Sequence, residues 1–196
     1  MTMRSESDAA LTRTQRARRR DIIDAAIAVL SQAGFAAASV DRIAREAATS
    51  KGTVLYHFGS KEGVLEEVVR SLYEEGGAYM TERILAASGA RERLRVYLDS
   101  NLRFIASRPE HITAVHRILE NQPTDAEDDT VGPLRQLLVA GQDAGELGPF
   151  DAEVVALMIR AIMDGASFYF STHPDLDLDR HIAEVIRIFD RATAVA

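Results

Sequence analysis

The sequence predicts an all-α protein. Segments long enough to classify repeat their apolar residues at a helical spacing of three or four, and no alternating run of strand length occurs in the 196 residues. Gly, Pro or Asp-rich turns bound these segments. Hydrophobic residues make up 46% of the chain and charged residues 27%, which is typical of a globular protein. We therefore expect helices packed around a sizeable core.

Residues 1–13 are polar and aperiodic, and we interpret them as a disordered arm. A helix is predicted from Thr14 onward, because Ile23, Ala26 and Leu30 share one face, and Gly34 ends it. This helix is rich in arginine.

Two short helices follow. Ser39 is a suitable N-cap for a helix of about two turns through Ala47. Asp41 lies in the first turn, where the helix dipole stabilises an acidic side chain. Ser50 can cap a third helix over residues 51–56, and Gly59 interrupts the chain after it.

The rest of the chain is predicted to be helical as well. The apolar stripe that begins at Val64 continues past Gly76 and Gly77, which are candidates for a kink, to Leu85. Asp179 is interpreted as the N-cap of the last helix. Further helices are expected near residues 90–107, 110–120, 130–144, 151–172 and 179–194.

The charge of the chain is unevenly distributed. The net charge is −7, but residues 1–61 hold ten Lys or Arg against six Asp or Glu, so this part is +4 and the remainder is −11. Parts of opposite sign suggest a module that binds a polyanion attached to a body with another task. The alternative is a disordered basic leader on an acidic globule.

A basic helix followed by two short helices and a tight turn is the helix-turn-helix arrangement, whose last helix enters the major groove of DNA. The segment over residues 39–62 reads SVDRIAREAATSKGTVLYHFGSKE. Its serine cap, "IA" pair, "GT" and aromatic-His-Phe run resemble the DNA-binding signature of the tetracycline-repressor (TetR) family of bacterial regulators. The resemblance covers roughly residues 14–68 and implies a DNA-binding domain over 14–60.

The expected DNA contacts follow from the motif. Residues at the start of the third helix reach base edges, Gly52 lets the backbone come close, and Tyr56, His57 and Lys61 meet phosphates. Arg42 and Arg45 are candidates for backbone contacts. The predicted DNA-binding residues are Ser39, Arg42, Ser50, Lys51, Gly52, Thr53, Tyr56, His57 and Lys61.

Three positions depart from the family pattern. Ala48 and Thr49 stand in the turn where the family usually has Gly and an apolar residue, and Leu55 stands where it commonly has a Tyr that meets a phosphate.

The resemblance implies that residues 61–196 form a helical effector-binding and dimerisation domain. Dimerisation has independent support, because the segment 151–172 is apolar on more than one face and 179–194 has a broad apolar face. Paired with their copies, these helices would form a two-fold four-helix interface, and the alternative is one core helix in a monomer. Candidate residues for binding a small molecule, each of which could instead belong to the core, are Tyr79, Tyr97, Asn101, Phe104, His116, Met158 and Met163.

Other classes of protein find little support. The chain has no cysteine, so disulfides, thiolate zinc sites and cysteine nucleophiles are excluded, and no catalytic or phosphate-binding signature occurs. The stretch 154–170 is interrupted by Arg160 and Asp164, so neither a membrane span nor a signal peptide is expected. We expect a cytoplasmic homodimer without metal or cofactor, a repressor that binds a palindromic double-stranded operator and is released by a small-molecule effector. The alternative is a helical enzyme or adaptor in which residues 14–58 are only structural.

Overall fold

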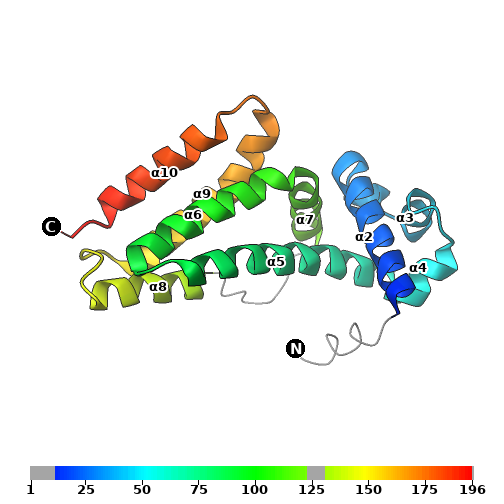
Figure 1. Cartoon of the computed structure of the whole chain (residues 1–196). Coiled ribbons are helices and arrows are strands. Elements are labelled where there is room, and N and C mark those ends of the chain that lie inside the picture. Colours follow the sequence, from blue (N-terminus) through cyan, green and yellow to red (C-terminus); the bar gives the residue numbers. More distant parts are fainter. Residues whose placement is uncertain (1–11, 123–130, 196) are drawn as a thin grey trace. The chain divides into compact units, whose positions relative to one another are not determined.

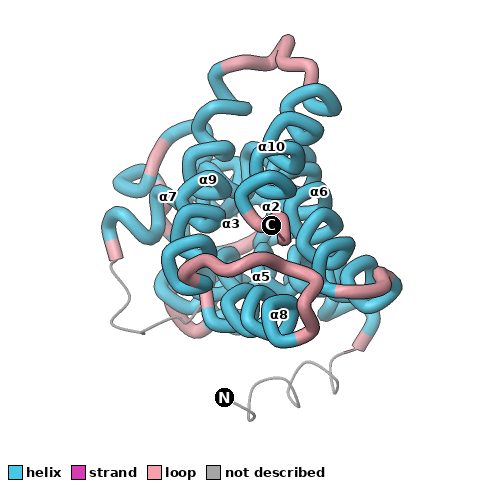
Figure 2. The backbone as a smooth tube through the Cα atoms, turned by 90° about the vertical axis from the view of Figure 1, so that its left-hand side faces the viewer, coloured by secondary structure: helices cyan, strands magenta, loops and turns pink. Residues whose placement is uncertain are grey.

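The computed structural model describes residues 12–122 and 131–195, and all regular structure in these residues is helical (Figures 1 and 2). The predicted fold class is therefore confirmed. The helices are α2 (Arg13–Ala33), the 3₁₀ turn η1 (Phe35–Ala37), α3 (Val40–Glu46), α4 (Lys51–Phe58), α5 (Lys61–Ala86), α6 (Ala90–Ser107), α7 (Pro109–Asn121), α8 (Gly132–Asp143), α9 (Ala152–Thr172) and α10 (Leu178–Ala192).

The described chain divides into two compact units. The first holds the described residues up to Leu72 together with the stretch that begins at Glu110, and the second holds the residues from Tyr73 to Pro109 and those after residue 130. Helix α5 contributes to both units, so this division does not coincide with the boundary expected after residue 60. The helix-turn-helix prediction concerns only the first three helices of the first unit.

Helix α2 begins and ends with clear local signals. Thr12 is its N-cap: the Thr12 hydroxyl accepts from Gln15 N at 3.2 Å, and the Gln15 side chain accepts from Thr12 N at 2.9 Å. Thr12 and Arg13 therefore belong to this helix and not to the expected arm. The rest of that arm, residues 1–11, lies outside the described residues. Gly34 ends the helix as predicted, with a φ of +84° that favours glycine.

The core of the first unit is formed where α2, α3, α4 and α5 meet. Ala47 is the C-cap of α3 and is buried. Five large side chains in this core are fully or almost fully buried: Ile22, Leu30, Ile43, Val54 and Leu65. Their burial explains why such short helices as α3 and α4 are stable, since isolated helices of this length are not.

Helix α7 also packs in the first unit, through a buried histidine. His111 is 7% exposed, and its Nε2 lies 2.8 Å from the carbonyl oxygen of Val68 in α5. The Ser71 hydroxyl donates to the same carbonyl at 3.1 Å. These contacts join α7 to the part of α5 that belongs to the first unit.

Helix α5 runs without interruption through the glycine pair that was a candidate for a kink. The packing of Gly76 gives another reason for glycine at this position. A Cβ atom on Gly76 would lie 3.0 Å from Cε1 of Phe104 in α6. Gly76 therefore allows α5 and α6 to approach closely within the second unit, which is a packing reason for glycine there.

Helix α6 is the centre of the second unit, and α8, α9 and α10 pack around it. The largest fully buried side chains here are Leu98, Leu102, Leu138 and Ile159. The prediction that Asp179 caps α10 is wrong: the side chain of Asp177 accepts from Arg180 N at 3.0 Å, and Asp179 lies in the first turn. Three acidic residues at spacing two made the choice ambiguous in the sequence.

Helix α9 is apolar on two sides. Its inner face holds the buried residues Ala156, Ile159, Met163 and Ala166. Phe168, on the other face, is 73% exposed. By length and hydropathy alone α9 could cross a membrane, a property that the core helix of a soluble protein can share. The helix carries an ion pair, Arg160 Nε to Asp164 Oδ1 at 3.0 Å, in its middle.

The turn between α3 and α4 holds the single described residue other than glycine with positive φ. Ala48 has φ of +47°, and its Cβ is strained in this left-handed conformation. Ala48→Gly should therefore stabilise the first unit by about 1 kcal/mol. The measurement is urea-induced unfolding followed by circular dichroism.

The matched control is Ala17→Gly, in the ordinary helical backbone of α2, where glycine should destabilise by roughly 0.5–1 kcal/mol. If both variants are destabilised alike, the backbone of Ala48 is not strained.

Candidate nucleic-acid interface

The two serines expected to contact DNA are helix caps in the structure. The Ser39 hydroxyl accepts from Arg42 N at 3.2 Å, and the Ser50 hydroxyl accepts from Thr53 N at 3.0 Å. The hydroxyls of Ser50 and Thr53 also lie 2.9 Å apart. A capping serine remains exposed and keeps free lone pairs and a rotatable O–H, so capping and a DNA contact are compatible.

The outer face of α4 presents exposed residues in the order that the sequence predicts. Lys51, Gly52 and Tyr56 are exposed, Tyr56 to 74%, whereas Val54 on the opposite side is fully buried. A Cβ on Gly52 would meet only the Ser50 hydroxyl, at 3.7 Å, so open space lies over this backbone. The face is therefore free to approach another molecule closely.

The charged residues of this unit differ in how they are held. Lys51 Nζ forms an ion pair with Asp41 Oδ2 at 2.9 Å, and Lys61 Nζ lies 4.4 Å from the centre of the Phe35 ring. Neither pairing is buried, and both can be exchanged for phosphate or base contacts. Arg42 and Arg45 are exposed on α3.

The position of α4 depends on Arg19 of α2, a residue that the sequence analysis did not single out. Its Nη1 donates to the carbonyl oxygen of His57 at 2.6 Å, and its guanidinium lies 4.5 Å from the centre of the Phe58 ring. Its Nη2 also lies 3.2 Å from Glu67 Oε2 of α5. Arg19 therefore fixes the end of α4 against both α2 and α5. Its place among four other arginines of α2 gave no signal of this role.

His57 lies beside these arginines. Partial burial lowers the pKa of its imidazole, and the charges of Arg19 and Arg18 lower the pKa further. The free protein therefore holds His57 neutral at pH 7, with one ring N–H able to donate to a phosphate oxygen.

Comparison with known proteins agrees with this geometry. Residues 22–68 match the family model of bacterial regulatory proteins of the tetR family. This stretch of the chain is similar to the DNA-binding region of TetR-family regulators. Helix α4 lies within the matched residues and occupies the place of the recognition helix in a helix-turn-helix domain.

Two relatives are HTH-type transcriptional regulators. BetI 1 of Chromohalobacter salexigens is 35% identical over 85 residues, which cover 43% of this chain and 42% of the relative. BetI of Vibrio campbellii is 30% identical over 99 residues, which cover 50% and 49%. The matched region thus spans less than half the length of these curated relatives.

Solved structures share the fold over most of the chain. A tetR-family regulatory protein from Rhodococcus RHA1 has a TM-score of 0.79 at 24% identity, with 91% of this chain and 98% of that chain covered. AibR, solved in complex with isovaleryl coenzyme A and operator DNA, has a TM-score of 0.74 at 18% identity, with 87% and 97% covered.

The structure brings together only some of the residues predicted to bind a small molecule. The Tyr79 and Phe104 ring centres lie 5.9 Å apart in the second unit. Tyr97 hydrogen-bonds to Asn101, and burial raises the pKa of its phenol. Met163 is buried as expected.

Two of these residues lie elsewhere. Met158 does not face the interior, because it is 55% exposed on the outer side of α9, and the broad apolar surface of this helix made its two faces indistinguishable in the sequence. His116 belongs to α7 and to the first unit.

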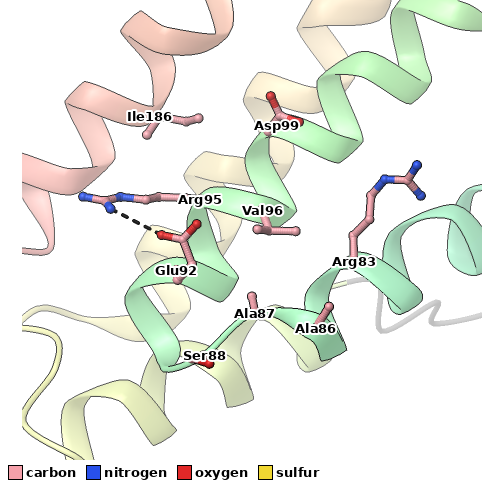
Figure 3. Close-up of a pocket in the computed structure, with 9 residues that line it drawn as sticks. All are labelled: Arg83, Ala86, Ala87, Ser88, Glu92, Arg95, Val96, Asp99 and Ile186. Atoms are coloured by element: carbon pink, nitrogen blue, oxygen red, sulfur yellow. Dashed lines mark hydrogen bonds and ion pairs between the residues drawn. The ribbon is translucent and has the colours of Figure 1, made fainter.

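The second unit also has an open groove of about 830 Å³, which contains none of the predicted residues. Figure 3 shows the ion pair between Arg95 and Glu92, which are three residues apart on α6, and the nearby Ala86 and Ala87. Its lining residues are Arg83, Ala86, Ala87, Ser88, Glu92, Arg95, Val96, Asp99 and Ile186.

A contact between His57 and phosphate should make DNA binding depend on pH. A phosphate anion raises the pKa of the imidazole in the complex above its lowered value in the free protein, so the complex takes up a proton. Affinity should therefore rise as the pH falls from about 8 to about 6, by at most about tenfold per pH unit for each His57. Fluorescence anisotropy at constant salt measures this.

His57→Gln keeps a hydrogen-bond donor but does not titrate, and should have a flatter pH profile than the wild type. Identical pH profiles for the two proteins would show that His57 does not meet a phosphate.

Proposed function

We propose that this chain is a TetR-family transcriptional regulator, a cytoplasmic homodimeric repressor that binds a palindromic operator and is released by a small-molecule effector. The observation that carries the proposal is the exposed apolar face of α9, which the second unit alone does not cover. Two recognition helices read two half-sites, and a dimer supplies the second.

The outer face of α9 has the chemistry of a subunit interface. Its exposed apolar side chains follow one another at helical spacing and lie opposite the buried face, so the second unit alone does not cover them. Ile188 of α10 is likewise exposed. An apolar surface of this kind on a soluble protein indicates association. The exposed apolar residues on α9 are Val154, Leu157, Met158, Phe168 and Tyr169.

Replacing one of these residues with a charge should separate the subunits. Leu157→Asp places a carboxylate in the proposed apolar interface and should give a monomeric mass in light scattering at micromolar concentration. The variant should lose affinity for a two-half-site duplex much more than for random DNA.

Leu85→Asp is the matched control, because Leu85 is an exposed leucine of α5 and not part of the α9 face. It should remain dimeric. A dimeric mass for Leu157→Asp would contradict the proposed interface.

The effector is proposed to bind in the second unit. The aromatic pair of Tyr79 and Phe104 and the half-buried Tyr97–Asn101 pair supply apolar and polar contacts of the kind that small-molecule sites combine. Helix α5 contributes to both units and offers a continuous element through which a change in the second reaches the first. AibR, which has the same fold, was solved in complex with isovaleryl coenzyme A and operator DNA, so a protein of this fold can bind both a small molecule and DNA.

Linkage gives the effector proposal a quantitative test. Compounds that raise the melting temperature of the full chain should weaken its affinity for a selected DNA duplex. That duplex should lower the affinity for the compound by the same factor, typically about 5–150-fold. Calorimetry with and without DNA measures both. A bound compound that leaves DNA affinity unchanged is not an effector, and a screen that yields only such compounds contradicts the proposal.

A further inference from the structure

An apolar side chain lies on the outer face of the recognition helix, among polar residues. Leu55 is 37% exposed, whereas its neighbour Val54 is fully buried and Phe58 lies beneath Arg19. Leu55 packs partly against the first unit and keeps about a third of its surface open to solvent. Leu55 follows Lys51 by four residues and Gly52 by three, so the three share one face of α4.

The direction of Leu55 places it near the end of α4 that enters the groove. Helical side chains lean toward the N-terminus and cover the preceding turn, which for Leu55 is the turn that holds Gly52. Gly52 has no side chain, and a Cβ there would have open space around it except for the Ser50 hydroxyl. The exposed part of Leu55 thus lies beside the uncovered backbone of Gly52 and is an apolar group on a face that also holds Lys51.

The chemistry of the major groove offers one apolar group to such a side chain. Base edges present hydrogen-bond donors and acceptors, with which a leucine cannot pair, and phosphates are charged. The exception is the 5-methyl group of thymine. We propose that Leu55 reads the 5-methyl group of a thymine in each half-site of the operator. This rests on the proposed function, in which α4 is the recognition helix of each subunit.

Replacing thymine with deoxyuridine tests the proposal, because it removes the methyl group and leaves the hydrogen-bonding edge unchanged. The probe is a duplex selected by the wild-type protein from a random pool, in which each thymine position is replaced in turn. At one thymine per half-site, affinity should fall by about fourfold for each half-site, the equivalent of one methyl group kept in water. The other replacements should have little effect.

The Leu55→Ala variant distinguishes a methyl contact from an effect on DNA shape. It should bind the thymine duplex about as weakly as the wild type binds the matching deoxyuridine duplex, and should no longer discriminate between the two. Leu85→Ala, which changes an exposed leucine outside α4, should discriminate as the wild type does. Circular dichroism checks that each variant is folded.

The failure of this inference is distinguishable from the failure of the proposed function. Equal discrimination by Leu55→Ala and the wild type, no sensitive thymine, or a selected half-site without thymine would each overturn the role of Leu55 while DNA binding stands. Absence of binding to any duplex at low salt would instead overturn the proposed function, and this inference with it.

Discussion

The arrangement of the DNA-reading surface depends on one partly buried arginine. Arg19 of α2 donates to the last turn of α4, covers the Phe58 ring and pairs with Glu67 of α5. Helix α4 has only eight residues and would not be stable alone. A guanidinium suits this place because it donates in several directions and stacks on an aromatic ring at once. The orientation of α4 is thus set by a residue of the preceding basic helix, far from α4 in the sequence.

The first unit was largely predictable because its signals are local. Capping serines, the glycine that ends α2 and the spacing of apolar residues depend on neighbours within a few positions, and the structure follows them closely. The turn between α3 and α4 lies where it was expected although Ala48 departs from the family pattern, because Ala48 adopts the left-handed conformation that glycine would adopt. Arg19 was missed because its partners are distant in the sequence.

The second unit was predictable in its helices and less so in its interior. Apolar residues on both sides of α9 do not indicate which side faces the core of the second unit, and Met158 was expected on the inner side although it is exposed. The open groove is formed by residues of α5, α6 and α10 that are far apart in the chain. No periodicity in one segment can indicate such a site.

The central claim is that a dimer of this chain reads two half-sites with two copies of α4. Selection of bound sequences from a random DNA pool by the full-length protein tests it most directly. The account predicts enrichment of an inverted repeat whose half-site centres are separated by one helical turn or a multiple of it, about 10–10.5 base pairs per turn. Enrichment of a single asymmetric site, or no enrichment above random DNA, would contradict it.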